Sequence, residues 1–484
     1  MKITVFNARV LQVILFLMGG MLLGAGTGQA QGPVSDGSTG TVVDATVPGS
    51  EFEITGGTVS GSNLFHSFSQ FSVPSLGTVT FLNDDGAIRN VVSRITGNGS
   101  SIIDGLITVG GLSPDFNLFL INPNGIIFGP DGKLDINGSF VASTSQSVEF
   151  GSQGIFTVSG ASSDLSLLTV SPSALLFQQM ATAQPLNSIQ MNGSVVSVPA
   201  GQSLVLLGGN PAPSALATGA VSINDTRLNA QSGRVEIGAV GGPGRVALGN
   251  TLELIFPQGL PKADIDLQRS SVDVGDFSGG AGGGVAQLQG RAVGLDDSLI
   301  LALNDSGLQG GGGIVIRAGR LTLDDSVALA ITTSPAAGGN VLLDLRQGPG
   351  QLRLLNGSKI SAETEGPGPG GSLNIEANDI EVLSDSGLGT ETRGNGNAGS
   401  VAIDTQTLWL ENGLISSNTF GGGNGGQLSI DAAERIDLLG LSEITALADD
   451  FNPDTGLFVP GVGAAGSLML TTGQLNIQGG SQIA

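Results

Sequence analysis

Few side chains in this chain could perform acid–base or nucleophilic chemistry. His66 is the only histidine among 484 residues, and there is no cysteine. One histidine would be enough for a Ser-His-Asp triad, and counting residues leaves that open. A lone histidine cannot form a histidine-rich metal site, and no thiolate is present to assist it. Because His66 lies in a Phe-rich stretch, we expect its ring to be packed or hydrogen-bonded within the fold.

Carboxylates are the other candidates, and one segment resembles the start of a calcium loop. Asp450, Asn452 and Asp454 place oxygen ligands at alternate positions, followed by Gly456. The closing glutamate of such a loop is missing, since Gly461 stands in its place. The alternative is an insertion loop in the longest repeat. We therefore expect no cofactor, and calcium at this segment is the alternative. The glycine runs lack the Lys-Ser/Thr signature of phosphate loops.

Composition narrows the class of protein and of partner. The net charge is −23, which repels nucleic acid phosphates and anionic membranes, so no nucleic acid partner is expected. Glycine is abundant, with 80 residues, yet it shows no collagen period, and 40% of the residues are hydrophobic. Short alternations of aliphatic residues with Gly, Ser and Thr predict many short strands joined by tight turns.

The N-terminus has the pattern of a secretory signal peptide over residues 1–30. Lys2 and Arg9 form a basic region before the apolar residues 10–23. Small residues ending at Ala30 predict cleavage between Ala30 and Gln31. No later stretch is long and apolar enough for a membrane span, so we expect no transmembrane helix in the mature chain.

The second half of the chain repeats with a spacing of 27 to 40 residues. Each repeat begins with glycine and a variable residue, then alternates apolar positions; the glycines are Gly312, Gly339, Gly371, Gly399, Gly426 and Gly466. A Leu-x-Leu element and a Ser-x-Ile element follow. Period-two alternation predicts strands, and repeats of this length predict a solenoid. We therefore expect an all-β, right-handed parallel β-helix, with glycines allowing positive φ at the corners. A β-propeller is the alternative, but its blades are longer and rich in aromatics.

Aromatic residues divide the chain, because most phenylalanines precede residue 180. We place a boundary near residue 275, between an N-terminal part at 31–275 and Gly-rich repeats at 276–484. The sequence ends at Ala484 within a repeat, so we expect a longer parent protein.

Two segments of the N-terminal part stand out. Asn122, Pro123, Asn124 and Gly125 suit the four positions of a type I β-turn, and Ile126 starts the next apolar run. The runs on both sides of this turn, residues 117–121 and 126–128, are rich in Ile, Leu and Phe, as in strands buried on both faces. Upstream lies a second segment with the residues Asn63, Leu64, Phe65, His66, Phe68 and Phe71.

In this order, behind a signal peptide, the two segments resemble the N-terminal secretion domain of filamentous-haemagglutinin-like exoproteins, the passengers of two-partner secretion. The resemblance is closest over residues 33–180. Residues 122–126 match the family motif Asn-Pro-Asn-Gly-Ile. A second family motif, Asn-Pro-Asn-Leu, is absent, and residues 89–97 stand in its region.

The resemblance implies a β-helix with extra capping strands. It also implies export through the periplasm of a double-membrane bacterium by an outer-membrane β-barrel transporter with periplasmic recognition domains. The mature protein would be secreted or associated with the cell surface, its N-terminal part directing secretion and nucleating folding.

Two classes of final activity remain open. The first is an adhesin-like or structural surface protein that meets a receptor or glycan on a host or neighbouring cell. The second is a polysaccharide lyase or hydrolase built on a parallel β-helix. Such enzymes need clustered carboxylates and sugar-stacking aromatics, whereas this chain has Trp409 alone and no tyrosine. We therefore expect no enzymatic activity.

Overall fold

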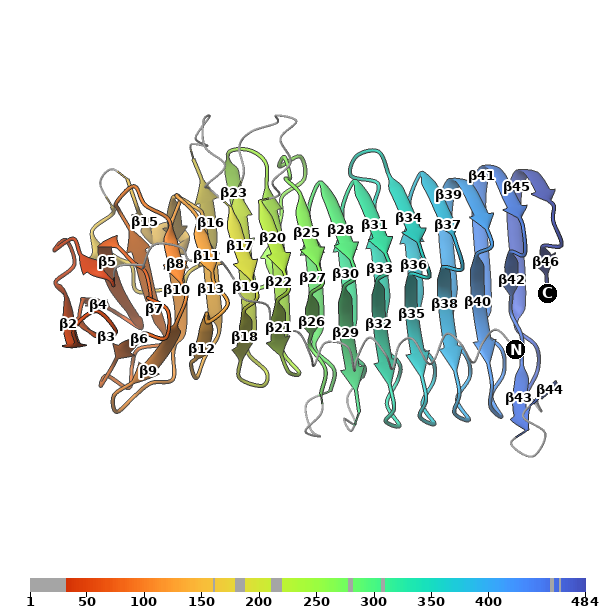
Figure 1. Ribbon diagram of the computed structural model, residues 1–484, viewed down its shortest axis with the longest axis horizontal. Coiled ribbons are helices and arrows are strands. Elements are labelled where there is room, and N and C mark those ends of the chain that lie inside the picture. The colour runs from red at the N-terminus through yellow and green to blue at the C-terminus, as the bar shows by residue number, and fades with distance from the viewer. Residues whose placement is uncertain are drawn as a thin grey trace.

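The computed structural model describes residues 32–159, 162–178, 188–209, 220–276, 282–305, 310–452, 457–460 and 463–484. These residues form a β-solenoid of about 13 turns, which runs lengthwise across Figure 1. The described helical segments are two short 3₁₀ turns, η1 (Gly151–Gln153) and η2 (Leu165–Leu167). The prediction of an all-β parallel β-helix is confirmed. Among the described residues, no helix is long and apolar enough to cross a membrane.

Three strand positions per turn stack into three long faces. On the first face, each strand pairs in parallel with the strand one turn later. Its strands are β5 (Asn63–Gln70), β7 (Asn90–Ile95), β10 (Asn117–Ile121), β13 (Phe140–Ser143), β19 (Ser203–Gly209), β22 (Arg234–Val240), β27 (Val285–Gln289), β30 (Gly313–Arg317), β33 (Val341–Asp344), β36 (Leu373–Glu376), and the first halves of β39 (Val401–Glu411), β41 (Gln427–Leu439) and β45 (Ser467–Ile477).

The second face is built in the same way and includes the second halves of β39, β41 and β45. Its other strands are β8 (Ser101–Ile103), β11 (Ile126–Phe128), β17 (Ile189–Asn192), β20 (Val221–Asn224), β25 (Ile265–Gln268), β28 (Ala292–Asp296), β31 (Arg320–Asp324), β34 (Gln351–Leu355) and β37 (Asp379–Leu383).

The third face consists of two ladders that follow one another. The first contains β3 (Glu51–Gly56), β6 (Thr78–Leu82), β9 (Leu106–Gly110) and β12 (Lys133–Asp135). The second contains β18 (Val195–Val198), β21 (Arg227–Ala230), β26 (Ser271–Asp273), β29 (Leu299–Asn304), β32 (Val327–Thr332), β35 (Lys359–Thr364), β38 (Gly387–Thr392), β40 (Leu414–Thr419), β42 (Glu443–Thr445) and β46 (Gln482–Ile483).

One apolar core fills the solenoid from Phe52 to Ala446. Alternate residues of each strand point inward, so the apolar positions of successive repeats stack. Ile314, Val341 and Leu373 are register partners in three consecutive turns. The predicted stacking of the repeats is therefore confirmed.

Corner glycines such as Gly350 and Gly357 have the predicted positive φ, but the glycine that opens each repeat is needed for a different reason. Gly339, Gly371 and Gly399 do not have positive φ. A Cβ atom on Gly371 would lie 1.8 Å from the carbonyl oxygen of Gly339, and one on Gly399 would lie 1.7 Å from that of Gly371. Close approach between the backbones of neighbouring turns therefore excludes any side chain at these positions.

A buried ladder of serines, which includes Ser298 and Ser358 of Ser-x-Ile elements, lies at another corner. The backbone N–H of Ser270 donates to Ser298 Oγ over 3.1 Å, and that of Ser298 donates to Ser326 Oγ over 3.0 Å. Each hydroxyl in turn donates to a carbonyl of its own turn, as Ser298 does to Asp296 O at 2.8 Å. The ladder satisfies backbone groups that the corner would otherwise bury without partners.

Strands outside the three faces are added to the N-terminal half, and the predicted capping strands are among them. Capping strands cover the first turn, namely β1 (Val34–Ser35), β2 (Thr41–Val47) and β4 (Thr58–Ser60). An antiparallel sheet, which we name the cover sheet, contains β14 (Ser147–Glu149), β15 (Ile155–Thr157), β16 (Ala174–Phe177), β23 (Gly244–Leu248) and β24 (Leu254–Ile255).

In the second half of the chain, β43 (Asp449–Asn452) pairs antiparallel with β44 (Leu457–Pro460). Strand pairing continues across residue 275, from β25 to β28 and from β26 to β29, and the division into domains stays a prediction.

Candidate functional site

The turn at residues 122–126 forms the corner between β10 on the first face and β11 on the second. The N–H of Gly125 donates to the carbonyl of Asn122 over 3.1 Å, which closes a β-turn. Asn124, at the third position, does not have positive φ, as a type I turn requires. The Asn122 side chain accepts from the N–H of Asn124 at 3.0 Å. The predicted turn is confirmed.

Both asparagine side chains also bind the preceding turn of the solenoid. Asn122 Nδ2 donates to Gly99 O and to Ser101 Oγ, both at 3.0 Å. Asn124 Nδ2 donates to Gly97 O at 2.8 Å. Asn122 is fully buried, so its amide supports the fold, whereas Pro123 and Asn124 stay partly exposed. Recognition of this turn by a transporter stays a prediction.

The upstream segment contributes β5, whose side chains alternate between two apolar environments. Leu64 and Phe68 point into the solenoid core. Phe65 points the other way and packs edge-on against Phe150 and Phe156 of the cover-sheet region, with ring centroids 5.4 and 4.9 Å apart. Phe71 follows the strand and packs against Phe68 at 5.2 Å. The segment is thus a strand buried on both faces.

His66 lies inside the core beside Phe68 and Phe81. Its Nδ1 atom is 3.1 Å from Thr41 Oγ1 on the capping strand β2. Burial lowers the pKa of His66 to about 4, so the ring is neutral at pH 7. The prediction of a packed and hydrogen-bonded histidine is confirmed.

An asparagine ladder, which we define as Asn63, Asn90 and Asn117, opens the first three strands of the first face. Asn90 Nδ2 donates to Asn63 Oδ1 at 2.9 Å, and Asn117 Nδ2 donates to Asn90 Oδ1 at 3.1 Å. The three residues are register partners. Sequence reasoning missed this ladder, although the recurrence of asparagine every 27 residues could have indicated it.

The ladder is closed by a segment from much later in the chain. Asn63 Nδ2 donates to the carbonyls of Leu168, at 2.8 Å, and Val170, at 2.7 Å. Thr169, between them, packs so closely on the β4–β5 turn that a Cβ atom on Gly61 would lie 2.7 Å from its carbonyl oxygen. The first turns of the solenoid are therefore complete only when residues 168–170 have docked.

Arg94 provides a second link between the same regions. From β7 it donates to Ser67 Oγ at 2.9 Å and to Ser162 Oγ at 2.6 Å. It also donates to the carbonyl of Thr157, and its guanidinium lies 4.3 Å from the ring centroid of Phe156. A single side chain thus joins the early strands to β15 and the loop that follows it.

The cover sheet and the first face enclose a second apolar core. Outward-facing residues of the first face meet inward-facing residues of the cover sheet, and the buried members are Phe65, Val92, Phe119, Ile121, Val141, Val148, Phe150, Phe156, Leu168, Leu175, Phe177, Val205, Leu207, Val240, Val246, Leu248 and Leu254. This core explains why the four residues before the Asn122 turn, 118–121, are all apolar. The predicted burial on both faces is confirmed for β10, whereas in β11 Ile127 is only partly buried, because the cover sheet does not extend over the second face there.

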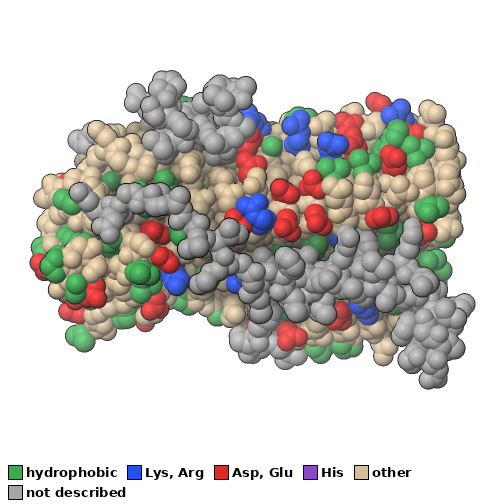
Figure 2. Space-filling view, in the orientation of Figure 1, with side chains coloured by type: hydrophobic (Ala, Val, Ile, Leu, Met, Phe, Trp, Pro, Cys, Tyr) green, Lys and Arg blue, Asp and Glu red, His purple; other side chains and the backbone are tan. Residues whose placement is uncertain are grey.

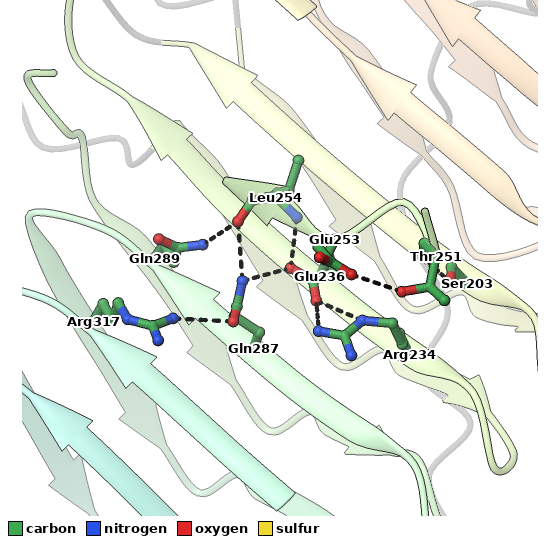
Figure 3. Close-up of polar contacts among 9 residues, drawn as sticks. All are labelled: Ser203, Arg234, Glu236, Thr251, Glu253, Leu254, Gln287, Gln289 and Arg317. Carbon is green, nitrogen blue, oxygen red and sulfur yellow. Dashed lines mark hydrogen bonds and ion pairs between the residues drawn. The ribbon is translucent and has the colours of Figure 1, made fainter. Parts of the chain in front are cut away.

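The far end of the cover sheet is held by a buried carboxylate, Glu236 (Figure 3). Glu236 Oε1 accepts from Arg234 Nη2 at 2.6 Å, and Oε2 accepts from the N–H of Leu254 at 3.1 Å and from Gln287 Nε2 at 2.9 Å. Gln289 Nε2 donates to the Leu254 carbonyl at 2.7 Å. Burial raises the pKa of Glu236, and the charge of Arg234 opposes this shift. The network fixes β24 to β22 and β27.

The remaining sequence candidates fall into two groups. Residues 1–31, with the cleavage site at Ala30 and Gln31, lie outside the described residues. Of the calcium candidates, Asp454 is not described, and of Asp450 and Asn452 only the backbone, in β43, is described. Within the described ranges, no group of three or more His, Asp or Glu residues is placed to hold a metal ion.

The fold and the site define a class of protein, a β-solenoid whose N-terminal turns are capped, covered by an antiparallel sheet and joined by polar ladders. The family model of the TPS secretion domain matches residues 31–285, which is more than half of the chain. The chain belongs to this family, the two-partner-secretion domains. The family is a secretion domain and not an enzyme family.

A solved structure supports the same fold. The crystal structure of the HMW1 secretion domain from Haemophilus influenzae matches with a TM-score of 0.52 and 18% sequence identity, over 94% of this chain and 98% of that chain. At this identity the likeness concerns the fold alone. No curated protein matches the chain.

Proposed function

We propose that this chain is a surface exoprotein, adhesin-like or structural, exported by a dedicated outer-membrane β-barrel with periplasmic recognition domains. The TPS family itself implies a secreted protein and an outer-membrane transporter partner. The observation that carries the proposal is the match over residues 31–285, the part of the chain that holds the Asn122 turn, the asparagine ladder and the cover sheet.

The N-terminal turns also suit a role in nucleating folding outside the cell. Each turn of a solenoid contacts only its neighbours, so turns can form one after another as the chain emerges. Each new turn buries apolar area, which biases threading outward without a nucleotide energy source. The early turns have the additional second core, which later turns lack among the described residues.

Export measured with and without the candidate barrel tests the proposal. The chain outside the cell is quantified by protease accessibility, and we expect it to depend on the barrel and to fall for the double variant Asn122→Ala/Asn124→Ala. The matched control is Asn395→Ala/Asn397→Ala, two asparagines of a corner outside the family match. Export without the barrel, or equal loss in both double variants, would refute the proposal.

A pair of identical core substitutions tests the nucleating role. Ile95 in β7 and Ile375 in β36 are both buried in the same core. Truncation of a buried isoleucine to alanine costs about 2–5 kcal/mol at either site. Ile95→Ala should slow export more than Ile375→Ala, because its turn must form first. Equal export rates would contradict nucleation by the early turns.

A further inference from the structure

The outer surface of the second face carries a continuous polar column in the last turns. Thr322, Arg353, Glu381, Trp409, Asp437 and Asn476 are register partners in six consecutive turns. Their inward neighbours, such as Leu408 and Leu410 on either side of Trp409, are buried in the core. Neighbouring turns of a parallel sheet lie about 4.8 Å apart, so the column marks a straight track of about 24 Å.

Trp409 is the only tryptophan of a chain that has no tyrosine, and it lies in the middle of this track. It is partly exposed, with Glu381 beside it on one turn and Asp437 on the next. An indole ring on a sheet surface offers a flat apolar platform, and its N–H can donate a hydrogen bond.

The carboxylates on both sides of Trp409 are held in place. Glu381 Oε2 accepts from Arg353 Nε at 2.7 Å. Asp437 Oδ2 accepts from Arg435 Nε at 2.9 Å, and its Oδ1 accepts from Asn476 Nδ2 at 3.2 Å. Fixed side chains lose little conformational entropy on binding, so the column presents preorganised donors and acceptors.

When Arg435, which pairs with Asp437 from the same strand, is counted, the charge along the column is balanced, although the chain as a whole has a net charge of −23. Glu381 and Asp437 are each paired with an arginine. Figure 2 shows acidic and basic side chains interspersed over the surface of these turns. A balanced track within an acidic protein suits an uncharged ligand with many hydroxyl groups and disfavours a polyanion.

We propose that the column from Thr322 to Asn476 is a binding track for a linear neutral polysaccharide, with Trp409 stacking on one sugar ring. The exposed groups of Arg353 and Glu381 and the amide of Asn476 would exchange hydrogen bonds with the hydroxyls of the flanking sugars, whereas the buried Asp437 holds Asn476 in place. A peptide strand is less suited to this surface, since the backbone groups of β37, β39 and β41 are already paired within the sheet. The inference rests on the adhesin-like part of the proposed function and is independent of the export route.

The single tryptophan makes the site directly observable, because all indole fluorescence of the chain comes from position 409. The purified mature chain is titrated with cellohexaose and with N-acetylated chitohexaose, and with a galacturonic acid hexamer as the acidic comparison. We expect a saturable change in Trp409 emission with at least one neutral hexamer and none with the acidic one. Glu381→Gln, which keeps the reporter, should weaken binding about fivefold, as expected for loss of one charge-assisted hydrogen bond.

Arg346→Gln is the matched control, because Arg346 is an exposed arginine in the turn between β33 and β34 that also pairs with a carboxylate, Asp404, at 2.6 Å. The Arg346→Gln variant should bind the neutral hexamer with the affinity of the wild type. Calorimetry on Trp409→Ala, which lacks the reporter, should detect no binding. The inference is overturned if neither neutral hexamer binds, if the acidic hexamer binds best, or if Trp409→Ala binds normally. A chain that needs the barrel for export yet fails to bind would refute this inference alone.

Discussion

Replacing Asn90 with alanine should weaken the first turns of the solenoid selectively. Asn90 is the middle member of the asparagine ladder, donating to Asn63 Oδ1 at 2.9 Å and accepting from Asn117 Nδ2 at 3.1 Å. The substitution leaves both groups without these partners.

The magnitude follows from the burial of the two groups that lose their bonds. Asn63 is fully buried, so its orphaned Oδ1 costs the full desolvation penalty of about 1–3 kcal/mol. Asn117 is partly exposed, so its Nδ2 can bond water and adds less. We expect a local loss of about 2–3 kcal/mol, which is about a 30- to 150-fold change in an equilibrium constant.

Hydrogen exchange followed by mass spectrometry measures this loss where it occurs. Peptides from β5, β7 and β10 should exchange about 30- to 150-fold faster in Asn90→Ala. Peptides from β33 and β36 should be unchanged, because solenoid turns interact mainly with their neighbours. The matched control is Asn192→Ala, an exposed asparagine at the end of β17. Acceleration below about threefold in β5 and β7, or an equal effect of Asn192→Ala, would refute the assigned role of the ladder.

Three further predictions concern single positions. The pKa of His66 falls from 6.5 to about 4 on folding, so the unfolded chain gains the proton first as the pH is lowered. Local stability of about 3 kcal/mol, present above pH 6.5, should therefore be lost as the pH falls to 4. Hydrogen exchange of β5, measured as a function of pH, should show this loss of stability in the wild type but not in His66→Phe. Parallel pH profiles for the two proteins would disprove the assigned effect of His66. Glu236→Ala leaves the N–H of Leu254 and Gln287 Nε2 without their acceptor and should destabilise β24 by about 2–4 kcal/mol. Glu236→Gln should cost less than half of that free energy, as measured by hydrogen exchange of residues 244–255. Equal costs of the two substitutions would show that the charge, and not the hydrogen bonds, holds the network. Gly371→Ala places a Cβ atom 1.8 Å from Gly339 O and should strongly lower the midpoint temperature of thermal unfolding. Gly387→Ala, whose Cβ atom has its nearest contact at 3.6 Å, should leave that midpoint unchanged. Similar midpoints for the two variants would refute the backbone-contact explanation of the repeat glycines.

Local sequence signals predicted the strands, their stacking and the Asn122 turn. The apolar positions of the repeats recur with period two at matching places, so register follows from the requirement to bury one side of each strand. The Asn-Pro-Asn-Gly turn depends on φ preferences and on the hydrogen bond from the N–H of Asn124 to the Asn122 side chain, two residues earlier. Both are properties of the segment itself. The lone histidine was assigned correctly because its neighbours were apolar.

Other features depended on residues distant in the chain. The partners of the asparagine ladder lie 27 residues apart, and its closing carbonyls lie 105 and 107 residues from Asn63. The apolar run before the Asn122 turn indicated that β10 was buried on both faces but gave no sign that β14, β15, β16, β23 and β24 form the sheet that covers it. Positive φ at corner glycines such as Gly350 and Gly357 was predicted, but only the packed turns revealed that, at the repeat-opening glycines, a neighbouring carbonyl oxygen occupies the space of the missing Cβ.

The amino-acid sequence by itself thus determined a stack of parallel strands and a corner turn, because alternation and turn preferences act over a few residues. Only the tertiary structure decided which polar groups meet across turns, what covers the first face and where Glu236 is buried. Those contacts form between segments tens of residues apart, and their partners are set by the register and order of the turns once the chain has coiled.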